Sequence, residues 1–415
     1  MGPVQVLRTF PIISQEGAMT TLKKSDHAPV PFWRDERYLK IIIQVIVVAL
    51  VVFSGFYLVR NLVTGLEDLG IPLSFRFLKI EAQFDIGETL IEYSRTSTYA
   101  RALLVGILNT IKVSFLGIIF ATIFGIIVGI ARLSKNWLIN KLAAIYVEAL
   151  RNIPLLVFLI FLSTTVFHKL PRVKEALSAW GWAYLTNRGI YVVWPQPADG
   201  WDVYRWFLLG SFVVGLIVAI IKYREGVRTG RMPLYWLWGS VTFILLAGVT
   251  WVIAQFIAGQ PLVLDFPYLA GRNFKGGQSL SPEFMAIFTG LVIYTSAFIA
   301  EIVRAGIQAV SKGQREAATS LGLTGFQTMR LVIFPQALRV IIPPLTSQYL
   351  NLTKNSSLAI AVGYPDLFAV GSTIINQAGR AVEIILIMMG VYLTFSLLTS
   401  LFMNWYNKHT RLVER

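Results

Sequence analysis

Eight long runs of apolar residues dominate the pattern of hydrophobic and polar positions along the chain. The hydrocarbon core of a bilayer is about 30 Å thick, and an α-helix needs about 20 apolar residues to cross it. A helix also satisfies its own backbone hydrogen bonds, as a segment surrounded by lipid must. The pattern therefore predicts eight membrane spans, at approximately 39–59, 102–131, 142–167, 206–222, 234–257, 284–308, 336–358 and 383–404.

The seventh run is the least regular of the eight. Pro343 and Pro344 interrupt it, and a polar stretch occupies 351–357. Proline lacks the N–H group that a helix interior requires, so we expect a broken helix here. Such a helix is tolerated at membrane depth where neighbouring helices bury it. The predicted fold is all-α, a polytopic transmembrane helical bundle of about eight spans.

The distribution of Lys and Arg predicts which connections face the cytoplasm. Because cytoplasmic connections carry an excess of these residues, the basic segments and both termini are expected on that side. The opposite-side segment 61–98 is instead net acidic. One connection, 167–205, differs, because it places five Lys or Arg on the outer side. Its Pro, Gly and Trp content predicts a partly folded external segment. The basic segments are 1–38, 132–141, 222–231, the stretch after 308, and 408–415.

Composition supports a membrane protein and excludes several kinds of site. The 415 residues are 55% hydrophobic and 14% charged, which is too apolar for an ordinary soluble domain. The net charge is +15, but the basic residues lie beside apolar runs, so we expect no nucleic-acid partner. The absence of cysteine excludes disulfides, thiolate metal sites and cysteine nucleophiles. His27, His168 and His409 lie far apart outside the apolar runs, so neither a metal site nor a catalytic dyad is expected.

The segment 304–335, between the sixth and seventh runs, carries the most specific pattern. Strong helix formers fill 314–321, and Gly322 stands where the left-handed turn of a helix C-cap favours glycine. A second short helix is expected to begin at Thr324 and to end near Pro335. On this pattern alone, the segment is typical of a helical hairpin lying on the membrane surface.

The spacing within this segment resembles a longer motif. Glu, Ala and Ala at 316–318 are followed after three residues by Gly322. Nine further residues lead to an aliphatic residue, which is followed by one residue, an apolar residue and Pro335. This arrangement resembles the EAA loop of permease subunits of ATP-binding-cassette (ABC) importers. Val332 stands where that family usually has Ile, and Phe334 where it usually has Leu. Both departures keep the apolar character.

Flanking segments narrow the resemblance to the polar amino-acid branch of that family, and the large insertion resembles the Q-type subunit of its general L-amino-acid transporter group. The resemblance implies a five-helix permease core plus three extra spans, the first, fourth and fifth. The similar segments are 100–112, 146–156, 294–306 and 352–358. The implied divisions are 1–38, a cytoplasmic N-terminal tail; 39–100, an extra span and external segment; 101–167, the first part of the core; 168–283, an insertion with external loops and two extra spans; and 284–415, the second part of the core with the coupling loop 304–335.

The resemblance implies that this loop transmits energy from a separate ATPase. A short helix seated in a groove of an ATPase moves as the ATPase closes, and tilts the sixth and seventh spans. The chain has no G-x-x-x-x-G-K-[S/T] phosphate loop, so we expect it to bind no cofactor and to be no enzyme itself. ATP and Mg²⁺ are expected in the partner ATPase. The implied coupling residues are Glu316, Ala317, Ala318 and Gly322, with Pro335 closing the motif.

The implied function is inward transport of L-amino acids across the bacterial cytoplasmic (inner) membrane by alternating access. The implied partners are two ATPase subunits on the cytoplasmic side, a second, homologous permease forming a heterodimer, and an external or periplasmic solute-binding protein. An ion-gradient-driven secondary amino-acid transporter is the alternative, and it predicts paired inverted repeats and a coupling carboxylate at the midplane. A membrane enzyme would need a nucleophile, a metal cluster or a carboxylate pair within a span. The sequence shows neither set of features.

Polar residues inside the apolar runs are candidates for the solute pathway, because charge within a span is costly. Lys112 lies near the middle of the second span, with Asn109 one turn earlier on the same face. A pathway role and a structural ion pair both remain open for Lys112. For Thr295 and Ser296, hydrogen bonding between helices is the alternative. The remaining pathway candidates are Asn351, Lys354 and Asn355.

Two pairs of opposite charge are spaced to meet on one helix face. Glu148 and Arg151 are three residues apart, as are Glu301 and Arg304. Each pair lies near the predicted cytoplasmic end of its helix, where we interpret it as a structural or gating contact.

Overall fold

The computed structural model describes residues 36–68, 70, 73–229 and 234–410, and it divides into two units, Met1–Leu73 and Ser74–Arg415. The first unit contains one long apolar helix, α1 (Glu36–Asp68), which includes the first predicted span. Most of the predicted N-terminal tail, as well as part of the basic segment 222–231 and the last residues of the basic tail 408–415, lie outside the described residues.

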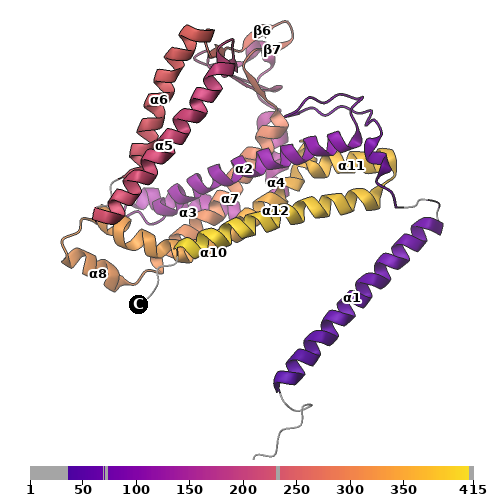
Figure 1. Ribbon diagram of the computed structural model, residues 1–415, viewed down its shortest axis with the longest axis horizontal. Coiled ribbons are helices and arrows are strands. Elements are labelled where there is room, and N and C mark those ends of the chain that lie inside the picture. The colour runs from indigo at the N-terminus through magenta and orange to yellow at the C-terminus, as the bar shows by residue number, and fades with distance from the viewer. Residues whose placement is uncertain (1–35, 69, 71–72, 230–233, 411–415) are drawn as a thin grey trace, which may run out of the picture. The chain divides into compact units, whose positions relative to one another are not determined.

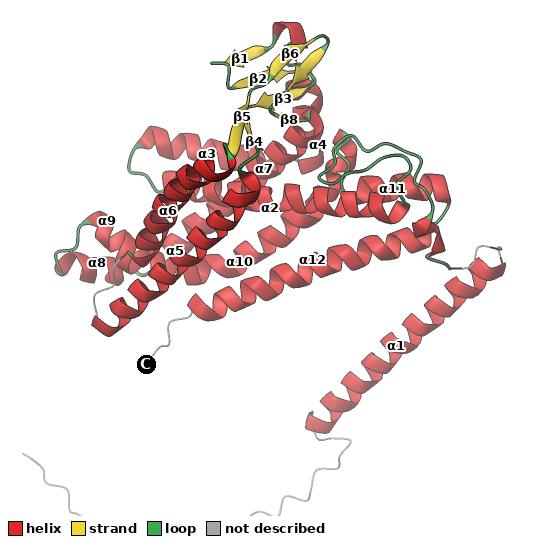
Figure 2. Cartoon of the chain, turned by 45° about the horizontal axis from the view of Figure 1, so that its top comes forward, coloured by secondary structure: helices red, strands yellow, loops and turns green. Residues whose placement is uncertain are grey.

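The second unit is a bundle of long helices with a group of short strands beside it (Figures 1 and 2). Its helices are η1 (Arg76–Lys79), α2 (Tyr99–Ala131), α3 (Trp137–Asn152), α4 (Leu155–Phe161), η2 (Leu162–Phe167), η3 (Val173–Glu175), α5 (Trp201–Thr229), α6 (Tyr235–Ala258), α7 (Pro282–Gln308), α8 (Lys312–Ser320), α9 (Gly325–Thr328), η4 (Met329–Ile333), α10 (Phe334–Asn355), η5 (Ser356–Val362), α11 (Leu367–Ala378) and α12 (Ala381–Thr410).

The predicted fold class is confirmed. Among the described residues, seven helices are long and apolar enough to cross a membrane, and α3 with the α4–η2 helix makes a further, bent candidate. The chain is therefore an all-α, polytopic helical bundle. The short helix α11, between the last two spans, was not predicted from the sequence.

The third predicted span, 142–167, corresponds to two helices with a sharp bend between them. Helix α3 ends at Asn152, and the following helix turns by 104°. The cause is Pro154, because a residue that precedes proline is disfavoured in helical conformation. Ile153 accordingly adopts an extended backbone, with φ −94° and ψ 131°.

The bent pair nevertheless follows α7 for half its length. Tyr146 of α3 contacts Ser296 in the middle of α7, with 2.7 Å between the two hydroxyl oxygens. Beyond η2, the Nε2 atom of His168 lies 3.7 Å from the Glu283 carboxylate at the start of α7. The two pieces therefore lie along the N-terminal half of α7.

The seventh predicted span is present, but the expectation that its two prolines interrupt the helix was wrong. Helix α10 is continuous through Pro343 and Pro344, and it tightens into the 3₁₀ helix η5 only at Ser356. Ile342 and Leu345, on either side of the prolines, are buried in the core of the bundle. Packing against neighbouring helices holds the helix together where proline removes backbone hydrogen bonds.

Helices α2 and α7 form the centre of the bundle through a very close approach. A Cβ atom on Gly125 would lie 2.5 Å from Cγ2 of Ile299, and one on Gly129 would lie 2.8 Å from the carbonyl oxygen of Ala300. Only glycine permits this separation of the two helix axes. Helix α10 packs on α7, α12 packs on α10, and α11 packs on α2.

The insertion between η2 and α7 contains all the named strands of the described chain. A four-stranded antiparallel sheet has the order β1-β2-β3-β8, and two hairpins pair β4 with β5 and β6 with β7. Helices α5 and α6 form an antiparallel pair that packs mainly on itself (Figure 1). The strands are β1 (Leu177–Ala179), β2 (Ala183–Thr186), β3 (Gly189–Val192), β4 (Trp194–Pro197), β5 (Leu262–Asp265), β6 (Tyr268–Ala270), β7 (Asn273–Lys275) and β8 (Gln278–Leu280).

The second unit has two distinct ends. The β end, where α7 begins, holds the strands, segment 74–98 and α11. The α8 end, where α7 finishes, holds α8, α9 and η4. Most of the candidate functional residues lie at one of these two ends, whereas Thr295 and Ser296 lie in the middle of α7.

Candidate functional site

The motif residues at the α8 end form two short helices joined by a tight turn. Gly322 has φ +77°, the left-handed conformation that glycine adopts without strain. The turn is closed by hydrogen bonds from Gly322 N to Thr319 O (2.9 Å) and from Leu323 N to Ala318 O (3.2 Å). Thr324 then caps α9 in a capping box with Gln327. The first helix, the turn at Gly322 and the start of the second helix at Thr324 are thus confirmed. The predicted end of the second helix near Pro335 was wrong, because η4 continues directly into α10 and proline fits the first turn of that helix.

This segment presents charged and apolar side chains together on its surface. Glu316 and Ala317 are exposed, and the Glu316 carboxylate has no ion-pair partner among the described residues. Ala318 is only 2% exposed and faces the chain's own helices, so it supports α8 rather than lying on its free face. Leu321 and Phe326 are 81% and 75% exposed, although both are large apolar side chains. Exposed apolar groups around a charge are typical of a surface that binds another protein.

Leu321 and Phe326 were not identified from the sequence. Leu321 lies beside Gly322 and Phe326 beside Gly325, at positions where an apolar residue is equally compatible with packing under the turn. Pro335, the last motif residue, is exposed in the first turn of α10. The motif therefore passes from an exposed helix directly into a membrane span.

A charge cluster lies next to this segment at the end of α7. The Glu301 carboxylate accepts hydrogen bonds from Arg304 on the same helix, with 3.2 Å to Nε, and from Arg132 at the end of α2. The structure thus forms the Glu301–Arg304 pair and extends it to a second helix. The other predicted pair is not formed, because Glu148 is exposed and the Arg151 guanidinium lies 5.5 Å from the ring centroid of Phe298.

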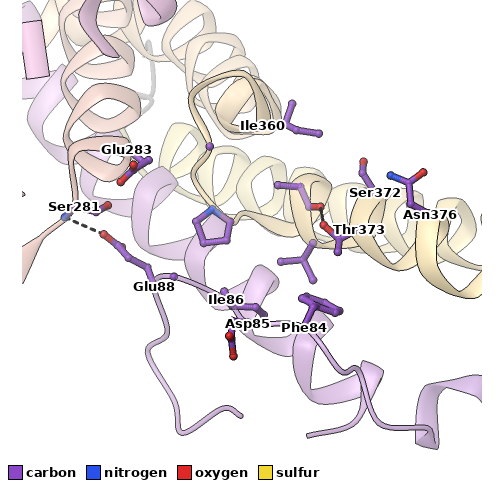
Figure 3. Close-up of a pocket in the computed structure, with 15 residues that line it drawn as sticks. Phe84, Asp85, Ile86, Glu88, Ser281, Glu283, Ile360, Ser372, Thr373 and Asn376 are labelled. Atoms are coloured by element: carbon purple, nitrogen blue, oxygen red, sulfur yellow. Dashed lines mark hydrogen bonds between the residues drawn. The ribbon is translucent and has the colours of Figure 1, made fainter. Parts of the chain in front are cut away.

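At the β end, a cavity of about 580 Å³ opens beside α11 and the start of α7 (Figure 3). Asp85 is held by Arg95, whose Nε lies 2.7 Å from its carboxylate. This hydrogen bond lowers the pKa of the Asp85 carboxyl, so the carboxylate stays ionised and paired with Arg95 at neutral pH. Its polar lining residues are Asp85, Glu88, Ser281, Glu283, Ser372, Thr373 and Asn376.

Glu88 ties three parts of the chain together at the edge of this cavity. Its Oε2 atom lies 3.3 Å from Lys112 Nζ on α2, and its Oε1 atom accepts a hydrogen bond of 3.1 Å from Ser281 N at the start of α7. The Glu88 carbonyl oxygen accepts from Asn109 Nδ2 at 2.9 Å. Lys112 Nζ also lies 4.1 Å from the ring centroid of Phe284. Two interpretations of Lys112 were open, an ion pair and a role in the solute pathway. The structure contains the ion pair, with Glu88, and the pathway role stays a prediction.

The other predicted pathway residues are dispersed. Ser296 bonds to Tyr146, which is the helix-to-helix contact considered above, and Thr295 is buried beside it. Asn351 and Lys354 are exposed near the end of α10, and Asn355 is half-buried. None of the predicted pathway residues lines the β-end cavity.

The carboxylates that line the cavity were not identified from the sequence. Asp85 and Glu88 belong to segment 61–98, which was recognised only as acidic. Nothing in the local sequence shows which carboxylate folds back onto the bundle.

A buried carboxylate anchors the wall of the cavity. Asp366 is fully buried, caps α11 by accepting from Ala369 N at 2.9 Å, and accepts from the Tyr392 hydroxyl at 3.1 Å. Thr110 of α2 accepts from Leu367 N at 3.0 Å. These bonds fix α11 against α2 and α12.

The chain is thus a polytopic bundle with an exposed helical segment between two of its spans. Residues 211–412 match the family described as "Binding-protein-dependent transport system inner membrane component". Two named relatives match over 92% of the chain. The chain belongs to this family and is a multi-pass inner membrane protein.

Two relatives and one solved structure illustrate the similarity. The chain is 46% identical to the "General L-amino acid transport system permease protein AapQ" of Rhizobium johnstonii, over 92% of this chain and 94% of the relative. It is 43% identical to the "Glutamate/glutamine/aspartate/asparagine transport system permease protein BztB" of Rhodobacter capsulatus, over 92% and 96%. A crystal structure of an amino acid ABC transporter is 22% identical, with a TM-score of 0.43, over 75% of this chain and 95% of that one.

Proposed function

We propose that this chain is the permease subunit of an ABC importer that moves L-amino acids inward by alternating access. The observation that carries the proposal is segment 312–335 between two spans, in which Glu316, Leu321 and Phe326 are exposed together, as a surface that binds another protein would require. The names of the two relatives, both amino-acid permeases, support the substrate class.

The connections of α8 suit it to transmit movement. Three residues join α8 to α7, and η4 leads from α9 directly into α10. Helix α7 packs on α2, and α10 packs on both α7 and α12. A displacement of α8 by an ATPase would therefore tilt the central helices together, because a packed core moves as a unit.

The proposed assembly places the α8 end in the cytoplasm and the β end outside. Two ATPase subunits, which hold ATP and Mg²⁺, bind at the α8 end. A second, homologous permease completes a heterodimer, and an external solute-binding protein delivers the amino acid at the β end. The excess of Lys and Arg in the connections at the α8 end supports this orientation.

Reconstitution tests the energy source. The chain, its co-purifying permease and its ATPase are placed in proteoliposomes with the cognate binding protein, and uptake of acidic, basic and neutral L-amino acids is measured. We expect uptake to require ATP and to be unaffected by collapse of proton and sodium gradients. Uptake by this chain alone, driven by either gradient, would contradict the proposal and support the secondary transporter.

Lys112 and Lys354 test the solute pathway. If both contact the amino acid, Lys112→Met and Lys354→Ala each raise the half-saturating amino-acid concentration about tenfold, because ~1.4 kcal/mol of binding free energy is lost. Lys112→Met also leaves Glu88 without its cation, so the double variant K112M/E88Q is the control. Full recovery of uptake in the double variant would assign Lys112 a structural role, and an unchanged Lys354→Ala would remove Lys354 from the pathway.

A further inference from the structure

The connection 167–205 contains five Lys or Arg, although it is expected on the outer side. In membrane proteins the excess of Lys and Arg usually lies in the cytoplasmic connections, so this number is unusual. Three of them, Arg172, Lys174 and Arg188, line one cavity of about 460 Å³. Arg272, which follows α6 in the chain, joins them from the other half of the insertion. The unusual charge of this connection is therefore concentrated at one place in the folded protein.

Three separate segments bring these cations together. Arg172 and Lys174 lie at η3, Arg188 lies in the turn between β2 and β3, and Arg272 lies in the turn between β6 and β7. Asn187 N bonds to Pro171 O at 2.9 Å, which joins the first two segments. Arg188 Nη1 donates to Arg272 O at 3.1 Å, which joins the last two.

A small core beneath the cavity holds this arrangement. Phe274 stacks on Tyr184, with ring centroids 4.5 Å apart, and contacts Tyr191 at 5.2 Å. Val173 packs into the same cluster. The Tyr191 hydroxyl donates to Asn273 Oδ1 at 2.7 Å. The cavity is thus formed by the folded insertion before any ligand arrives.

The charge of this cavity is not compensated within the part of the chain that the structure describes. None of its four cations forms an ion pair with a described residue, and Glu175 is the one acidic residue in its lining. Like charges around one cavity repel each other, so an anionic ligand would relieve an unfavourable arrangement. The volume exceeds that of a single carboxylate and suits several acidic side chains of one loop.

We propose that this basic cavity is a docking site for acidic side chains of the external solute-binding protein. The inference rests on the proposed function, which requires a binding protein to meet the β end. The cavity lies on the strands and their turns rather than on a spanning helix. At the opposite end of the same sheet, the turn between β1 and β2 exposes Trp180 (96%) and Trp182. Tryptophan and arginine are enriched in protein interfaces and their energetic centres.

A matched pair of double variants tests the site in the full reconstituted complex. K174E/R272E reverses two cavity charges, and K169E/K275E reverses two exposed cations of the same region that do not line the cavity. Both change the net charge equally, so they separate a local contact from a general field. The measurement is ATP hydrolysis as a function of the concentration of purified cognate binding protein, at low and high ionic strength.

We expect K174E/R272E to raise the half-saturating binding-protein concentration about tenfold or more at low ionic strength, with unchanged basal ATP hydrolysis. K169E/K275E should change it by less than about twofold, and high salt should reduce the difference between wild type and K174E/R272E. Equal behaviour of the two double variants would overturn the proposal. A second outcome would also overturn it: K174E/R272E alters the basal rate of ATP hydrolysis in vesicles that contain anionic lipid, while the half-saturating binding-protein concentration stays unchanged. That result would assign the cavity to lipid headgroups. A wild-type complex that does not respond to the binding protein would contradict the proposed function itself.

Discussion

Glu316→Lys is expected to reduce ATP-driven uptake at least about 100-fold, which corresponds to ~2.7 kcal/mol of coupling free energy. Glu316 is exposed on α8 and has no ion-pair partner among the described residues, so its replacement leaves the fold of the permease unchanged. The reversed charge would instead repel the basic group of the ATPase that the proposal pairs with this carboxylate. Uptake into proteoliposomes and co-purification of the ATPase are the measurements.

The control for this result is a second charge reversal at the same end of the bundle. Glu225 is exposed near the end of α5, and its surface ion pair with Lys222 contributes little to stability. Glu225→Lys should therefore leave uptake within about twofold of wild type. Glu316→Gln, which removes charge without reversing it, should retain an intermediate rate.

Gly322→Asp should also reduce ATP-driven uptake, but through a change in backbone conformation rather than through charge repulsion. A Cβ atom at Gly322 meets no neighbour, but its φ of +77° is strained for any other residue, so the turn between α8 and α9 would change shape. Intact ATP-driven uptake in either Glu316→Lys or Gly322→Asp would show that the coupling assignment is wrong.

Gly129→Leu is expected to have the largest effect on stability, lowering the free energy of unfolding by ~3 kcal/mol or more. The new side chain would begin 2.8 Å from the Ala300 carbonyl oxygen, and a helix backbone cannot move aside as a flexible side chain can. Helices α2 and α7 would have to separate. Two measurements test this expectation: the thermal unfolding of the purified permease in detergent, and the yield of folded permease after purification.

Gly390→Leu on α12 is the matched control, because a Cβ atom there meets nothing within 4 Å in this chain. Leucine favours helix over glycine by about 0.8 kcal/mol, so propensity alone predicts that both substitutions stabilise the protein. A loss of stability in Gly129→Leu together with a gain in Gly390→Leu would therefore identify packing between α2 and α7 as the cause of the loss. Equal stability of both would contradict the close approach of α2 to α7.

The spans were predictable because a membrane imposes a length and a composition on each helix, whatever surrounds it. The errors arose at prolines, where the outcome depends on neighbours. Pro154 ends α3, because it forces Ile153 out of helical conformation. Pro343 and Pro344 have no such effect, because buried contacts hold α10 together.

The motif at the α8 end was predictable for a related reason. A turn that needs φ above zero requires glycine, so Gly322 marks the turn in the sequence itself. The exposure of Leu321 and Phe326 was not predictable, since an apolar residue beside a turn can equally be buried. Nor was the partner of Lys112, because the 24 residues that separate it from Glu88 carry no signal of their contact.

The sequence by itself determined the apolar spans, the Gly322 turn in segment 304–335 and the resemblance to a permease family, since each depends on local composition or on spacing within about twenty residues. Only the tertiary structure decided which side chains meet. It paired Lys112 with Glu88, joined Glu301 to Arg132, and gathered the cations of a connection with unusual charge around one cavity. Such contacts join segments far apart in the chain, and their geometry follows from packing and chain direction, which no local pattern records.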